Sequence, residues 1–137
     1  MQHDEFIGQV QHRAKLSSRG DAERATRATL ETLGERVPGG LATNLAAQLP
    51  PEIGEHLRRT LDFGIEDTPG ERFDATEFVA RVAERSATDE PIAAYLARVV
   101  FEVANDATEG AVAQKVADTL PDDIRRLVTA GSSGGVG

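Results

Sequence analysis

The chain has 137 residues, the length of one domain, and this is enough for a hydrophobic core without stabilising cross-links. It contains no cysteine, which excludes disulfides and thiolate metal sites, and its net charge of −8 disfavours nucleic-acid phosphates and anionic membranes as partners. No apolar run approaches the roughly 18 residues that a membrane span needs. The N-terminus is polar and acidic, unlike a signal peptide, so we expect a cytoplasmic protein.

The first half of the chain predicts four helices. Apolar residues recur at helical spacing over residues 4–14 and along a longer second segment, and a leucine recurs every four residues in a third. A proline pair then marks the start of the fourth helix, because proline is tolerated in the first turn. The positions that carry these patterns are Phe6, Ile7, Val10 and Ala14; Ala22, Ala25, Thr29, Leu30, Leu33 and Val37; Leu41, Leu45 and Leu49; and Pro50, Pro51 and Ile53.

The second half of the chain predicts four more helices. Asp74, three residues before Glu77, is typical of a helix start and precedes a helix over residues 76–85. Asp89 and Pro91 mark the start of a longer helix, and we expect it to lie deeper than its counterpart because it is more apolar around its circumference. The apolar positions are Phe78, Val79, Val82 and Ala83; Ile92, Leu96, Val99, Val100, Val103 and Ala107; Val112, Val116 and Leu120; and Ile124.

The two halves align with each other. An offset of 71 residues pairs residues 22–60 with 93–131 without a gap, and nine of the 39 columns are identical. Composition alone would give roughly three identities. An offset of 72 residues pairs the first predicted helix with that over residues 76–85. The sequence therefore predicts an all-α protein in which two tandem four-helix repeat units pack into one compact domain.

Four segments follow from this alignment. We assign residues 1–61 to the first helical unit, 62–73 to a linker, 74–130 to the second unit and 131–137 to a tail. The linker carries three apolar residues and is expected to pack against the helices: Phe63, Ile65 and Phe73. The tail consists mainly of glycine and serine, so we expect it to bury nothing and to be disordered.

No residue is assigned to a catalytic, cofactor-binding or metal site. His3 and His12 are too far apart to be two ligands on one helix turn, and His56 aligns with Leu127 in the second half. A surface position is expected for each histidine. No nucleophile–base pair, phosphate-binding glycine loop or calcium loop can be found, so no enzyme chemistry and no cofactor is indicated.

An arginine and a glutamate recur four residues apart in both halves, as Arg27 with Glu31 and Arg98 with Glu102. Such pairs could in principle line a carboxylate site between the units, but helical di-metal sites of this type also need a Glu-x-x-His motif, and the chain has none. The preferred interpretation is an ion pair within each helix.

Three segments resemble a known family. They are residues 22–36 (AERATRATLETLGER), the Gly39-Gly40 pair followed by LAAQLP over residues 45–50, and FDATEF over residues 73–78. Together they are similar to the domain-of-unknown-function family 2267, and the resemblance extends to about Val128. It implies an all-helical prokaryotic protein and no particular activity. Thr119 stands where the family favours glutamine, which argues against an essential chemical role for Gln48 in both units.

Two functions fit these observations. The first is a non-enzymatic helical interaction or adaptor protein, monomeric or homodimeric, that binds an unidentified protein partner in a groove between the units. The alternative is a small-molecule or lipid-tail binder that uses an apolar cavity between them. Neither requires nucleic acid or a membrane. An enzyme is the third possibility, and no motif supports it.

Overall fold

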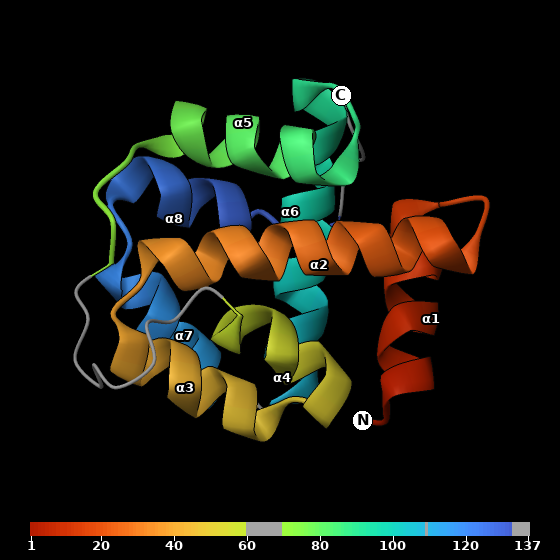
Figure 1. The fold of residues 1–137 in the computed structure, drawn as a ribbon, viewed down its shortest axis with the longest axis horizontal. Helices are drawn as coiled ribbons and strands as arrows, with labels where there is room; N and C mark the ends of the chain where they lie inside the picture. The colour runs from red at the N-terminus through yellow and green to blue at the C-terminus, as the bar shows by residue number, and fades with distance from the viewer. Residues whose placement is uncertain (60–69, 109, 133–137) are drawn as a thin grey trace.

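The computed structural model describes residues 1–59, 70–108 and 110–132. Within these residues the chain forms eight α-helices and no strand, which confirms that the fold is all-α (Figure 1). The helices are α1 (His3–Ala14), α2 (Arg19–Arg36), α3 (Gly39–Gln48), α4 (Pro51–Arg58), α5 (Ala75–Ser86), α6 (Glu90–Ala107), α7 (Ala111–Thr119) and α8 (Asp122–Val128).

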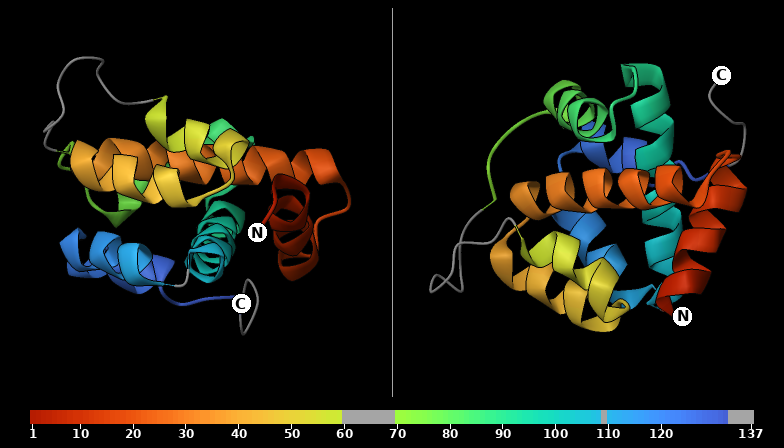
Figure 2. Two further views of the ribbon diagram at one scale, coloured as in Figure 1. Left: turned by 90° about the horizontal axis from the view of Figure 1, so that it is seen from below. Right: turned by 45° about the vertical axis from the view of Figure 1, so that its right-hand side comes forward.

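The helices lie in two layers around the crossing of α2 and α6. Helices α2, α3 and α4 form one layer and α6, α7 and α8 the other, with α1 at one side (Figure 2). Both α1 and α5 pack against each of the two long helices, and α3 packs against α7. The two halves of the chain therefore share one core.

The starts of three helices are determined by local sequence. The side chains of Ser18, Asp74 and Asp89 each accept a hydrogen bond from a backbone N–H in the first turn of α2, α5 and α6, over 3.0–3.1 Å. These bonds satisfy backbone donors that have no partner inside the helix. The starts predicted at Asp74 and Asp89 are thus confirmed, whereas the role of Ser18 was not predicted.

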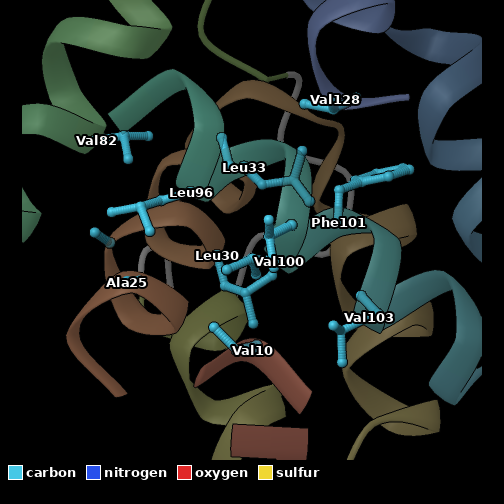
Figure 3. Packing of buried hydrophobic residues seen from close by; sticks show 14 of the residues in the cluster. Val10, Ala25, Leu30, Leu33, Val82, Leu96, Val100, Phe101, Val103 and Val128 are labelled. Carbon is cyan, nitrogen blue, oxygen red and sulfur yellow. The ribbon is translucent and has the colours of Figure 1, made fainter. Parts of the chain in front are cut away.

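All eight helices contribute to the core, and α2 and α6 bury the most residues. Leu30 and Val100 are fully buried and point into the space where these helices meet (Figure 3). The expectation that α6 lies deeper was wrong, because α2 and α6 each bury nine residues. Helix α2 can be this deep despite its polar sequence because the hydroxyls of Thr26 and Thr32 donate to the carbonyls of Ala22 and Ala28, over 2.8 Å each.

Two details differ from the sequence-based expectations. Ile92, predicted on the apolar stripe, is 40% exposed and lies in the first turn of α6. Gly131 and Ser132 are half-buried, and their carbonyls accept hydrogen bonds from Arg98 and Tyr95, so the start of the predicted tail is held against the protein. The rest of that tail lies outside the described residues, as do Phe63 and Ile65 of the linker.

Candidate functional site

A hollow of about 420 Å³ lies at the junction of α1, α2 and α4. Ile7, which is buried, forms its apolar floor, and most of the other side chains around it are charged or titratable. The residues that line it are His3, Ile7, Gly20, Glu23, Arg24, Arg27, Glu52 and His56. Its volume lies within the range of about 300–1,000 Å³ found for ligand sites in proteins.

Helix α2 presents Arg24 and Arg27 to this hollow because its other face is in the core. Ala25, Thr26 and Ala28 are almost fully buried, so helical periodicity places the two arginines together on the outer side. On the opposite side, α4 begins at Pro51 and carries Glu52 in its first turn, where an acidic residue is favoured by the positive end of the helix dipole.

Arg27 and Glu52 are unpaired in the described part of the chain. Both are exposed, and neither makes a hydrogen bond or an ion pair with another described residue. Their neighbours differ in this respect: Arg24 lies 3.8 Å from Asp21, and Glu23 lies 3.8 Å from Arg19. The hollow therefore presents one free guanidinium and one free carboxylate, from two different helices.

His56 is half-buried beside these groups, so the expectation of a surface position was wrong for this histidine. Burial lowers the pKa of His56 below its ordinary value of 6.5, and the positive charge of Arg59 lowers it further. The Nη1 atom of Arg59 lies 3.2 Å from Nδ1 of His56. The same nitrogen donates a hydrogen bond to Oε2 of Glu31 over 2.8 Å. His12 is exposed, as expected, while His3 is half-buried in the same hollow.

The structure brings His3 and His56 together, which no sequence pattern predicted. They belong to different helices, and only the return of α4 along α2 places both at one hollow. A short-range motif search cannot detect such a pair. The free state of Arg27 and Glu52 was likewise missed, because ion pairing depends on the rotation of each helix against its neighbours.

The recurring glutamates pair between helices. Glu31 on α2 lies 2.8 Å from Arg59 and 3.8 Å from Arg85, and Glu102 on α6 lies 3.3 Å from Arg13 on α1. The interpretation of Glu31 and Glu102 as partners within their own helices was therefore wrong. The reason is that α1 and α5 lie against the long helices and carry an arginine to each glutamate.

Arg85 and Arg13 each contact one further acid. Arg85 lies 2.6 Å from Glu35, and Arg13 lies 2.9 Å from Asp106. The Arg85 hydrogen bond lowers the pKa of Glu35 below its ordinary value of 4.5, against the opposing effect of burial. These ion pairs join helices and are part of the fold, so they are not free to bind a ligand.

Within the described residues, no group of three or more histidine, aspartate or glutamate side chains is arranged to hold a metal ion. None of the helices in residues 1–59, 70–108 and 110–132 is both long and apolar enough to cross a membrane.

Comparison with curated proteins gave no match. Comparison with protein families did: one family model matches residues 3–127, which is almost all of the chain and includes every lining residue of the hollow. That family carries the description "Uncharacterized conserved protein", and its match agrees with the resemblance seen in the sequence. The chain belongs to the DUF2267 family.

Proposed function

We propose that the chain is a non-enzymatic helical interaction protein of the prokaryotic cytoplasm, which binds a protein partner at the hollow between α1, α2 and α4. The observation that carries this proposal is the pair of free opposite charges on its rim, Arg27 and Glu52. Charged groups of this kind give specificity and orientation to a protein contact when the partner presents complementary groups.

The proposal includes the two-unit architecture, with residues 1–61 and 74–130 as related units. Helix lengths support it. They run 12, 18, 10 and 8 residues over α1–α4, and 12, 18, 9 and 7 residues over α5–α8. The helix contacts also correspond, since α1 packs against α6 as α5 packs against α2. Such a scaffold leaves the outer helix junctions available to partners.

A lipid-tail or small-molecule binder remains the rival. It would need an apolar cavity between the proposed units, where α2 crosses α6. That crossing is filled by fully buried side chains such as Leu30, Val99 and Val100. The hollow at α1, α2 and α4 is lined mainly by charged and titratable side chains, which suits a polar partner better than a hydrocarbon chain. These two observations favour the interaction protein.

We further propose that neither nucleic acid nor a membrane is a partner. The net charge of −8 repels phosphate groups, and several arginines are already engaged with acids, as in the contacts of Arg13, Arg81 and Arg85. The protein alone is a monomer or a homodimer.

Native mass spectrometry of the full chain after mild purification from its source tests the proposal. A bound protein, or a doubled mass of the chain, supports an interaction protein; a bound small molecule supports the rival and contradicts the proposal.

Arg27→Glu should abolish the complex because it reverses the free charge at the hollow. The matched control is Arg126→Glu on α8, an exposed arginine away from the hollow, and it should leave the complex intact.

A further inference from the structure

The second half of the chain shows what the free pair in the hollow can bind. The 71-residue offset pairs Arg27 with Arg98 and Glu52 with Asp123. Both of these counterparts bind backbone groups of the protein itself. The Nε atom of Arg98 donates to the carbonyl oxygen of Gly131 over 2.8 Å, and Oδ2 of Asp123 accepts from the backbone N–H of Ala75 over 2.9 Å.

These two contacts are complementary in their chemistry. One side chain binds a peptide carbonyl and the other binds a peptide N–H, and both bonds are charge-assisted, which makes them stronger than bonds between neutral groups. In the first half, Arg27 and Glu52 have no partner among the described residues. The basic and acidic side chains at these equivalent positions thus bind the protein's own backbone in the second half. In the first half they have no hydrogen-bond partner among the described residues.

The hollow itself differs between the halves in a way that keeps it polar. His56 stands where the second half has Leu127, and His3 stands where it has Ala75. Both histidines line the hollow, and Ile7 lies at its floor. The first half therefore combines polar walls with a small apolar surface, as sites for a few peptide residues do.

We propose that this hollow is a peptide-binding site. Arg27 donates hydrogen bonds to a carbonyl or terminal carboxylate oxygen of the partner chain, and Glu52 accepts a hydrogen bond from a peptide N–H or a terminal amino group. One small side chain of the partner lies over Ile7. This inference rests on the proposed function, because it names the chemistry that the partner presents at the same site.

The test uses the immobilised full chain to select peptides from a library of random sequences with free termini. The dissociation constant of each selected peptide is then measured for the unmodified chain and for four variants. Arg27→Gln and Glu52→Gln should each weaken binding about tenfold or more, as expected for the loss of a charge-assisted bond. The matched controls Arg126→Gln and Glu84→Gln change exposed residues outside the hollow and should leave binding unchanged.

All four variants are expected to fold, because these side chains are exposed, and circular dichroism checks this. The imidazole proton signals of His56 should also shift on saturation with peptide. Peptides that bind equally well to all variants would overturn the inference while leaving an interaction protein in place. Failure to select any peptide overturns the inference as well. The proposed function is tested by a separate measurement. It is overturned as well if native mass spectrometry finds neither a protein partner nor a dimer of the chain.

Discussion

The guanidinium of Arg85 on α5 lies 2.6 Å from the carboxylate of Glu35 on α2. The same guanidinium donates to the hydroxyl of Thr32 over 2.8 Å, and Thr32 is fully buried. The side chains of Arg85 and Glu35 are only 28% and 19% exposed. Water therefore screens this ion pair less than a surface pair, and it joins two helices that belong to different halves of the chain.

Replacing Arg85 by alanine should lower the free energy of unfolding by about 1–3 kcal/mol. The reason is that the charge-assisted hydrogen bond to Glu35 and the hydrogen bond to the buried hydroxyl of Thr32 are lost together. Urea denaturation followed by circular dichroism measures this. Arg126→Ala is the control, since Arg126 is exposed, and its effect should stay below about 0.5 kcal/mol. Equal effects of the two substitutions would show that the Arg85 contact adds no stability.

The same contact predicts a pH dependence. The hydrogen bond from Arg85 lowers the pKa of Glu35 below 4.5 in the folded protein, so the unfolded chain takes up a proton first as the pH falls. The stabilisation is complete above the ordinary pKa and is lost as the pH falls through the lowered one. Unfolding free energies measured between about pH 6 and pH 3 should therefore fall less steeply for Glu35→Gln than for the unmodified chain. Glu84→Gln, at an exposed position, should leave the slope unchanged.

The features that depend on local sequence could be predicted. The helix starts at Asp74 and Asp89 follow from side chains that bind a backbone N–H three residues on. The buried positions of Leu45 and Ile124 follow from helical periodicity, and both are fully buried. These patterns act over a few residues, so the sequence carries them directly.

The features that depend on how the helices pack could not. Glu31 pairs with Arg59 and Arg85, which are distant in sequence. The residues around Glu31 do not indicate that it pairs with these two arginines rather than with Arg27, four residues before it. The hollow and its free charges depend on the same packing. The extent of burial of α2 was not predicted either. A threonine such as Thr26 counts as polar in the sequence, but its hydroxyl donates a hydrogen bond to a carbonyl of its own helix and can therefore be buried.

Helices α1 and α5 are each followed by a C-cap residue with a left-handed backbone conformation, Lys15 and Ala87, each with φ of 57°. Glycine adopts this conformation without the steric cost of a Cβ atom. Ala87→Gly should therefore raise the free energy of unfolding by about 0.5–1 kcal/mol. Ala80→Gly, inside the same helix, should lower it by about 1 kcal/mol. Thermal denaturation should show opposite shifts for the two variants, and a loss of stability in both would contradict the prediction.

The close approach of α4 to α3 depends on Gly54. A Cβ atom at this position would lie 2.5 Å from the carbonyl oxygen of Ala46, which is backbone and cannot rotate away. Gly54→Ala should force the two helices apart and lower the free energy of unfolding by about 1–3 kcal/mol, although alanine favours helix formation. Gly8→Ala is the matched control, because a Cβ atom at Gly8 meets nothing within 4 Å. That substitution should raise the free energy of unfolding by about 0.5–1 kcal/mol through helix propensity alone. Urea denaturation of both variants measures the difference in sign, and a stabilising effect of Gly54→Ala would mean that α4 can move away from α3 without cost.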